Sequence, residues 1–452
     1  MKLTKFSCRI AAIAVASSIL LTACGGGASS TVSSADQAAA SMAQISTTAE
    51  NAAGTGAKEF EGSKFEMTTA AEGAVLDALK TVIADFEEES GADIVLTEYP
   101  RADYGNALKT RMAAGELPDV LETNGWSRLR YGEYLMTVND EPWYKDEIDV
   151  AKGILQGDGE DAYALMLTSS VLGVFCNKTA AESAGVDIYA INTLDDYKEA
   201  CQKIIDAGMV PMVNHNSAGD LTHVAGVFTT YEDAISCDAE AQLNGTWDWE
   251  SFMAELEYFA DLVDMGAYWK DRTTMGSTED VERIASGKSV FYFGNNTMYS
   301  KSCEEINPDA EFAVIPFPAA SETAKRYIAG GEGYAVGINK DSKELEACRA
   351  WLRYLAENGG PIAQEFGGIP AISTLEVEQT TPIVLAAETM EKYPDAVYVN
   401  MWDREYMPSG MWGSFGEASG MFYADSSPEN LVAIKDFLKQ NYDEKYAAAH
   451  AS

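Results

Sequence analysis

The sequence predicts an α/β fold, because runs typical of β-strands and runs typical of amphipathic helices alternate along most of the chain. The chain has 452 residues, of which 46% are hydrophobic, so it is long enough for two or three domains with substantial cores. Gly91, Gly115 and Gly208 stand where helical runs stop, as expected of residues that end a helix. These three observations together place the chain in the α/β class.

The first part of the folded chain, which begins near Phe60, contains strands separated by helices. Strands are expected at 64–69, 92–99 and 118–121, and helices at 75–86 and from about Asp103 to Gly115. In the first helix, apolar residues from Val75 to Phe86 recur at helical spacing.

The rest of the chain continues the same alternation. Strands are expected at 168–176, 209–213, 289–293 and 335–338, and helices at 193–205, 249–263, 277–286, 345–355 and from 427 onward. Thr193 and Asp196 have the spacing of a capping box, and Pro428 suits the first turn of the closing helix. The segment 401–422, which is rich in Gly, Met and aromatic residues, shows no clear helical period and is expected to be a loop.

The amino terminus has the features of an export signal. Lys2, Lys5 and Arg9 precede the apolar run 10–21, which is too short to cross a bilayer. Residues 21–24, Leu-Thr-Ala-Cys, resemble a bacterial lipobox, so we expect residues 1–23 to be a lipoprotein signal peptide and Cys24 to be lipidated. Residues 24–59 lack bulky apolar side chains and are expected to form a flexible, lipid-anchored spacer.

The charge of the chain argues against nucleic acid as a partner. The sequence has 71 acidic and 32 basic side chains, a formal charge of -39. Binding to a phosphate backbone or to an anionic lipid surface depends on clustered Lys and Arg. We therefore expect no nucleic-acid binding, and membrane contact through the lipid anchor only.

Cysteine and histidine residues suggest neither disulfides nor a metal site. Cys201 and Cys348 fall on apolar helix faces and are expected to be small buried hydrophobic residues. His215 and His223 lack a third ligand at a suitable spacing, and His450 is expected in a frayed tail. No cofactor is expected, because the apparent phosphate loop at 287–289 lacks a required glycine and the dinucleotide-like string that begins at Gly331 precedes a strand instead of a helix. The sequence also lacks GxSxG, the motif of a serine nucleophile, and HExxH, a zinc-binding motif.

Several short blocks, in order along the chain, resemble a known family. They are residues 86–94, 113–120, 173–178 with 184–186 and 193–197, 286–289, 315–318, 330–333 and 368–371. Together they resemble the family 1 extracellular solute-binding proteins, the sugar-capturing lipoproteins of bacterial ABC importers. Two positions depart from the family pattern: Leu194 replaces a Trp, and Asn295-Asn296 replace an aromatic residue.

The resemblance implies a two-lobe, periplasmic-binding-protein-like fold with three hinge crossings and a ligand cleft between the lobes. The hinges are expected near 169–174, 312–317 and 367–371. The N-terminal lobe would comprise 60–168 plus 318–366, and the C-terminal lobe 175–311 plus 372–452. The implied protein is a monomer on the outer face of the cytoplasmic membrane that captures a carbohydrate by hinge closure and delivers it to ABC permease subunits without chemistry.

A sugar site needs aromatic ring faces and planar polar side chains, because a pyranose has apolar C–H faces and a rim of hydroxyls. The aromatic candidates are Trp126, Trp247, Trp249, Trp402 and Trp412, whereas Trp351 is expected in the core. The polar candidates are Asn124, Asn214, Asn216, Asn295, Glu332 and Arg404, followed by Asn296 and Asp403. For each of these, ordinary packing or turn formation is the alternative role; Trp247 and Trp249 in particular can pack against their own helix.

Two other functions remain open from the sequence. The abundant acidic residues supply many carboxylate pairs, so an exported glycan-active hydrolase is one alternative. The other is a binding protein for a non-sugar solute or for a signalling partner.

Overall fold

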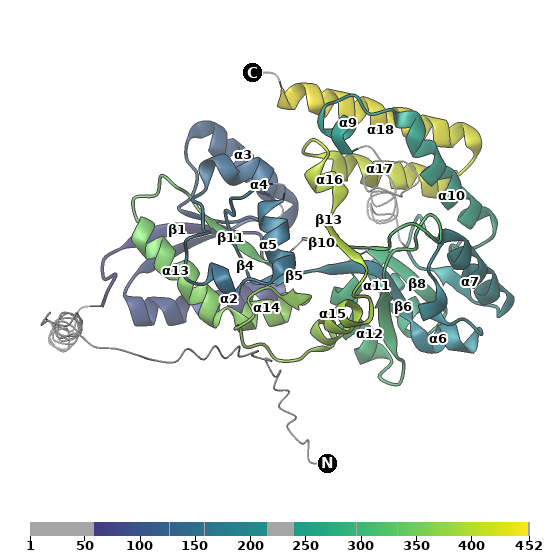
Figure 1. Cartoon of the computed structure of the whole chain (residues 1–452), viewed down its shortest axis with the longest axis horizontal. Helices are drawn as coiled ribbons and strands as arrows, with labels where there is room; N and C mark the ends of the chain where they lie inside the picture. Colours follow the sequence, from purple (N-terminus) through teal and green to yellow (C-terminus); the bar gives the residue numbers. More distant parts are fainter. Residues whose placement is uncertain are drawn as a thin grey trace, which may run out of the picture. The chain divides into compact units, whose positions relative to one another are not determined.

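The structure is a computed structural model that describes residues 58–125, 127–157, 159–214, 239–294, 296–331 and 333–450. In these ranges helices surround two main β-sheets, one of five strands and one of six (Figure 1). The α/β class expected from the alternating sequence pattern is therefore confirmed. Each sheet with the helices that pack on it is called a half below: the five-stranded half and the six-stranded half.

The five-stranded sheet has the order β2-β1-β3-β11-β4. Its strands are β1 (Lys64–Thr69), β2 (Asp93–Glu98), β3 (Val120–Glu122), β4 (Leu165–Met166) and β11 (Ala335–Ile338). The helices of this half are α2 (Gly73–Ser90), α3 (Arg101–Ala114), α4 (Arg128–Tyr131), α5 (Asp149–Gln156), α13 (Leu345–Asn358) and α14 (Gly360–Phe366), with the 3-10 turns η1 (Gly132–Tyr134) and η2 (Tyr144–Asp146). β1 runs parallel to β2 and β3, whereas β11 is antiparallel to β3 and β4.

Apolar side chains of α2 and α13 fill the core of this half. Leu79, Val82 and Phe86 of α2 are buried, and Phe86 packs against Trp351 of α13 with ring centroids 5.2 Å apart. Trp351 is fully buried, as expected from its helix. Gly91 ends α2 at φ 81°, and its N–H donates to the Glu87 carbonyl, which confirms the expected stop.

The six-stranded sheet has the order β13-β10-β6-β8-β7, with β9 also paired to β6. Its strands are β6 (Val171–Asn177), β7 (Val210–Met212), β8 (Ser289–Gly294), β9 (Phe312–Ile315), β10 (Tyr327–Gly330) and β13 (Val397–Asn400). The helices of this half are α6 (Lys178–Ser183), α7 (Leu194–Asp206), α9 (Ala239–Leu243), α10 (Met253–Asp264), α11 (Ser277–Ala285), α12 (Asn296–Ile306), α15 (Thr381–Lys392), α16 (Trp402–Glu405), α17 (Met411–Ala424) and α18 (Pro428–Ala449), with the 3-10 turns η3 (Ile188–Ala190) and η5 (Trp249–Phe252).

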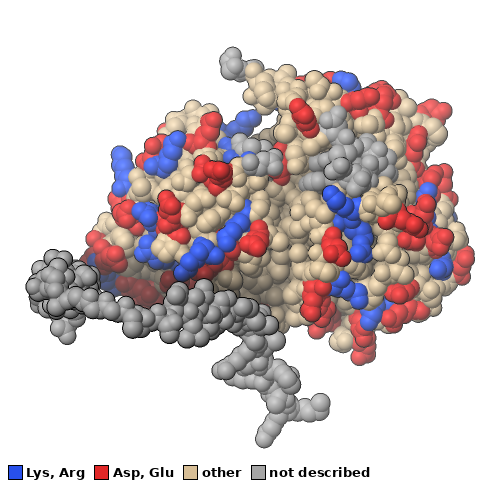
Figure 2. Space-filling view, viewed as in Figure 1, with Lys and Arg blue, Asp and Glu red and all other residues tan. Residues whose placement is uncertain are grey.

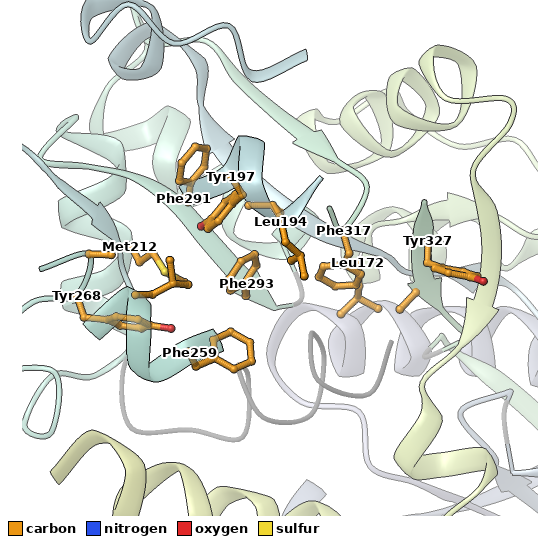
Figure 3. Packing of buried hydrophobic residues seen from close by; sticks show 14 of the residues in the cluster. Leu172, Leu194, Tyr197, Met212, Phe259, Tyr268, Phe291, Phe293, Phe317 and Tyr327 are labelled. Atoms are coloured by element: carbon orange, nitrogen blue, oxygen red, sulfur yellow. The ribbon is translucent and has the colours of Figure 1, made fainter. Parts of the chain in front are cut away.

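The core of the six-stranded half contains many aromatic side chains among its aliphatic ones (Figure 3). Tyr197 of α7 packs against Phe291 and Phe293 of β8, with ring centroids 4.9 and 5.5 Å apart. The start of α7 is fixed by the expected capping box: the Asp196 N–H donates to Thr193 Oγ1 at 3.1 Å, and the Thr193 N–H donates to Asp196 Oδ2 at 2.9 Å.

The chain passes between the two sheets three times. The first passage follows β5 (Thr168–Ser169), and the third contains β12 (Ile369–Pro370), which pairs antiparallel with β5. The hinges expected near 169–174 and 367–371 remain predictions. The second passage does not fall at the expected hinge at 312–317. Because β10 still pairs with β6 and β13, the chain changes sheet only between β10 and β11. Residues 318–330 therefore belong with the six-stranded sheet.

The third passage also extends beyond its expected end. Ala371, Ile372 and Leu375 pack into the core of the five-stranded half, and Val377 packs against it. The following helix, α15, packs in the six-stranded half. The expected lobe boundary at 372 is therefore displaced by several residues, because apolar side chains just after β12 remain attached to the first core.

Four cysteines lie in the described part of the chain, and all are buried and free: Cys176, Cys201, Cys303 and Cys348. Burial raises the pKa of Cys303 and Cys348 to about 12. Cys201 and Cys348 are thus confirmed as small buried residues. The expected signal peptide, Cys24 and the spacer up to residue 57 lie outside the described residues.

The surface carries acidic and basic side chains interspersed on the face seen in Figure 2, as expected of solvated charges that keep a domain soluble. Within the described ranges, no helix combines the length and the apolar character required to cross a bilayer. The same ranges contain no cluster of three or more His, Cys, Asp or Glu residues placed to hold a metal ion.

Candidate functional site

The loop that leaves β3 carries an unusual backbone conformation and an unpaired buried acceptor. Asn124 has φ 56°, and among the described residues it is the only one other than glycine with a positive φ. A short polar side chain tolerates this left-handed conformation better than most. Its Oδ1 atom is buried and accepts no hydrogen bond from any described residue. Such an atom needs a donor from water or from a ligand.

The side chain of Glu122, the last residue of β3, anchors the start of this loop through hydrogen bonds to the end of β1. Its buried Oε2 accepts hydrogen bonds from Thr69 Oγ1 at 2.5 Å and from the Ala70 N–H at 2.9 Å. Burial raises the pKa of the Glu122 carboxyl, although these hydrogen bonds and the Arg101 guanidinium act in the opposite direction. Because Thr69 is the last residue of β1 and Ala70 follows it, Glu122 joins the ends of two neighbouring strands.

A charged and polar array joins the two halves. Arg128 of α4 pairs with Glu405 of α16, with Nη2 and Oε1 3.2 Å apart. The Asn400 amide donates from Nδ2 to Glu405 Oε2 at 2.6 Å. The side chains of Arg128 and Glu405 are only 17% and 12% exposed. Both carboxylate oxygens of Glu405 are therefore held, one by each half.

Two glycines provide the space for this array. A Cβ on Gly157 would lie 2.1 Å from Arg128 Nε, and a Cβ on Gly331 would lie 2.2 Å from Asn400 Oδ1. A side chain at either position would therefore displace the Arg128 guanidinium or the Asn400 amide from its place in the array. Gly331 belongs to the 330–333 block and lies in the second passage between the sheets, so the backbone there approaches the polar array closely.

A cavity of about 350 Å³ opens beside Glu405. Ser127 and Arg130 of the five-stranded half line it on one side. The six-stranded half provides the remaining lining residues: Gln242, Leu243, Glu405, Tyr406, Met407, Pro408, Ser409, Tyr446, Ala449 and His450. The cavity therefore lies between the halves and combines aromatic rings with carboxylate, guanidinium, amide and hydroxyl groups.

Three of the expected aromatic platforms are instead buried in the core of the six-stranded half. Trp247 lies with its ring centroid 4.4 Å from that of Trp249 and 6.3 Å from that of Trp402. Trp402 also packs on Phe415 at 5.0 Å. A ring enclosed by other rings cannot offer its face to a sugar, so the alternative role of local packing describes these residues better. Trp412, on α17, is 38% exposed.

Asn214 also differs from its expected role. Its Nδ2 donates to the Phe293 carbonyl at 2.8 Å, and its Oδ1 accepts from the Phe293 N–H at 3.3 Å. The amide thus pairs with the backbone at the end of β8 and extends the β7 pairing beyond Met212, so Asn214 has a structural role. Asp403 is buried within α16.

The remaining candidates are not tested by the structure. Trp126, Asn216, Asn295 and Glu332 lie outside the described residues. Arg404 lies in α16 and Asn296 in α12, and the side chains of both fall outside the described part.

Sequence reasoning missed the ion pair and the end of the last helix. Arg128 and Glu405 are 277 positions apart, and no local pattern connects residues at such a separation. The expectation of a frayed tail at His450 is wrong, because α18 continues to Ala449 and His450 Nδ1 lies 2.8 Å from the Tyr446 carbonyl oxygen. The aromatic spacing of Tyr442, Tyr446 and His450, four residues apart, was a signal that could have revealed this.

Comparisons with known proteins agree with this architecture. Melibiose/raffinose/stachyose-binding protein MelE of Bacillus subtilis is 26% identical over 358 residues, which cover 77% of this chain and 82% of that protein. The multiple sugar-binding protein of Streptococcus mutans is 22% identical over 301 residues, covering 61% and 67%.

Solved structures show the same fold. A Bacillus subtilis binding protein in an open conformation matches with a TM-score of 0.79 at 23% identity, covering 87% of this chain and 100% of that one. A Bacillus licheniformis sugar transporter protein in complex with stachyose matches with a TM-score of 0.72 at 26% identity, covering 84% and 99%. The fold is therefore the two-lobe fold of solute-binding proteins.

The family profile described as "Bacterial extracellular solute-binding protein" matches residues 81–380, which is more than half of the chain. This match, the shared fold and the cavity between two α/β halves lead to one conclusion. The chain belongs to the bacterial extracellular solute-binding protein family.

Proposed function

We propose that this protein is the extracellular substrate-binding component of an ABC importer and that it captures an oligosaccharide between its two halves. The observation that carries the proposal is the cavity of about 350 Å³ lined by residues of both halves. The names of the relatives support the ligand class, because they bind melibiose, raffinose and stachyose or several sugars.

The chemistry of the site suits a neutral sugar. Glu405 and Gln242 present carboxylate and amide oxygens as acceptors, Arg130 and Ser409 present donors, and Tyr406 adds a ring. The buried Oδ1 of Asn124 provides a further acceptor at the end of β3. A sugar hydroxyl both donates and accepts, so it can satisfy these groups in the same complex.

Capture is proposed to occur by hinge closure, for which periplasmic binding proteins are well-known examples. The lobes of this proposal follow the strand pairing, with passages at 168–170, 331–334 and 369–380. A ligand that contacts both lobes favours the closed state by its differential affinity alone, and a shift from 1:99 to 99:1 needs about 5.5 kcal/mol. Several hydrogen bonds and stacked rings formed only on closure can supply a free energy of that size.

The proposal extends to the setting of the protein. Residues 1–23 would direct export, Cys24 would carry the lipid anchor, and the loaded protein would be recognised as a monomer by the permease subunits. Trp126, Asn216, Asn295, Glu332 and Arg404 remain predicted ligand contacts. No reaction is assigned to the site.

A panel of ligands tests the proposal. Thermal unfolding is measured with melibiose, raffinose, stachyose, other glycans, amino acids and peptides, and each ligand that raises Tm is then titrated by calorimetry. We expect stabilisation by oligosaccharides with one site per chain; at a ligand concentration of 100 times Kd the free energy of unfolding rises by about 2.7 kcal/mol. Stabilisation by an amino acid or peptide, without any response to sugar, would contradict the proposal.

The same samples test the rival function. A glycan-active hydrolase would release new reducing ends from the oligosaccharide during incubation. We expect the ligand to be recovered intact, and accumulation of shorter sugars would favour the enzyme.

A further inference from the structure

The end of α18 contributes part of the cavity wall. Tyr446, Ala449 and His450 line the cavity together with Ser127 and Arg130 of the five-stranded half. In Figure 1, α16 lies between β13 and the end of α18. The end of α18 is therefore separate from the strand ends, where Asn124 and Asn400 lie.

Three rings form a row along this helix. Tyr446 stacks on Tyr442 with ring centroids 5.9 Å apart and an interplanar angle of 22°. His450 stacks on Tyr446 at 4.1 Å and 26°. Tyr442 is buried, Tyr446 is partly buried and His450 is exposed. The row thus leads from the core to the cavity and ends in a ring at the surface.

The position of the outer ring is fixed by local contacts. His450 Nδ1 lies within hydrogen-bond distance of the Tyr446 carbonyl oxygen, at 2.8 Å. On the inner side, Tyr446 packs so closely on Gly245 that a Cβ at that position would lie 2.6 Å from the ring. The stacked pair is therefore supported from the helix and from the segment after α9, which is the kind of preorganisation that favours ligand stacking.

Fixed polar groups occupy the same cavity. Glu405 lines it while Arg128 and Asn400 hold its two oxygens, so the carboxylate cannot turn away. Each carboxylate oxygen has more than one acceptor position, so Glu405 can also accept from a ligand hydroxyl. A ring face beside a fixed acceptor matches a pyranose, which presents an apolar face next to hydroxyl groups.

We infer that His450, supported from behind by Tyr446, forms with Glu405 a subsite for an outer sugar unit of an oligosaccharide whose inner units bind at the strand ends. This inference rests on the proposed function and adds a determinant of ligand length to it. Longer oligosaccharides gain contacts at the end of α18, whereas a disaccharide bound at the strand ends does not reach them.

Calorimetric titration of the purified protein with melibiose, raffinose and stachyose tests the inference. His450→Ala is expected to raise Kd for stachyose by about five- to tenfold, the effect of one lost ring contact, and to leave Kd for melibiose unchanged. Tyr446→Leu is expected to show the same dependence on length. Glu444→Ala is the matched control, because Glu444 is exposed on the same turns of α18 and does not line the cavity.

The outcomes separate the two proposals. An equal loss of affinity for all three sugars in His450→Ala, or no loss for stachyose, would overturn the subsite while the proposed function stands. Absence of binding of any saccharide by the wild-type protein would overturn the proposed function and the subsite together. An unchanged Tm for His450→Ala in the absence of sugar shows that the variant keeps its fold.

Discussion

The buried carboxyl of Glu147, near the passages between the sheets, makes the stability of the fold depend on pH. Its Oε1 accepts a hydrogen bond from the Met166 N–H at 2.9 Å, and its buried Oε2 has no partner among the described residues. Burial raises the pKa of Glu147 well above its usual value, although the hydrogen bond from Met166 and the charge of Lys152 oppose the shift. The folded protein therefore holds this proton more tightly than the unfolded chain does.

This shift predicts a pH-dependent stability. A carboxyl with a raised folded-state pKa contributes stability below its unfolded pKa and loses that contribution as pH rises through the folded pKa. Gln resembles the protonated form and can still accept from Met166. We therefore expect Glu147→Gln to gain stability relative to wild type as pH rises from 4 to 8, as measured by urea unfolding at each pH. A difference between the two proteins that does not change with pH would contradict the shift.

Two of the asparagines that were expected to bind sugar show what residue type alone can predict. Asn124 and Asn214 both follow a strand, which identified them as candidates. The Asn214 amide forms hydrogen bonds with the backbone of β8, whereas the buried Oδ1 of Asn124 has no hydrogen-bond partner among the described residues. The difference depends on which strand lies beside each loop, and the local sequence does not contain that information.

At the scale of elements, periodic helices were predicted well and α17 was missed. The buried positions of α17 recur at helical spacing from Met411 to Tyr423, but they include Ser414, Ala418 and Ser419. Small residues occupy part of the buried face, and Met and Trp side chains lie outside it. The difference in hydrophobicity between the two faces, on which a periodicity argument depends, is therefore lost. Capping boxes and glycine stops were more reliable, as α7 and α2 show, because they act through local backbone groups.

Gly330 lies where β10, β13 and the first passage between the sheets come into close contact. A Cβ at this position would lie 1.8 Å from Tyr398 Oη and 2.5 Å from the Ser170 carbonyl oxygen. Tyr398 also contacts Ser169, with Oη and Oγ 2.9 Å apart. We expect Gly330→Ala to lower the free energy of unfolding by about 1–3 kcal/mol, measured as a lower urea midpoint.

Gly413 of α17 provides the matched control, because a Cβ there would meet nothing within 4 Å. Replacing a helical glycine by alanine gains about 0.5–1 kcal/mol, so Gly413→Ala is expected to raise the urea midpoint. Equal midpoints for the two variants would show that the packing around Gly330 is looser than described.

For the molecule as a whole, the resemblance predicted two α/β lobes with three hinge crossings, one of them at 312–317, where the strand pairing shows no change of sheet. Residues 315–318, with their prolines and apolar residues, have the composition of a connection between lobes. They are followed by β10, however, which still belongs to the six-stranded sheet. Sheet membership depends on the pairing of β10 with β6 and β13, which are distant in the sequence. The ion pair of Arg128 and Glu405, which joins the halves, could not be predicted either, because these two residues are also distant in the sequence.

The proposed closure of the two halves on an oligosaccharide changes the size of the molecule in solution. Small-angle X-ray scattering measures that size with and without saturating stachyose, provided that calorimetry shows the sugar to be bound. The radius of gyration is expected to fall when stachyose binds. An identical radius of gyration for the free and the sugar-bound protein would contradict the proposed closure.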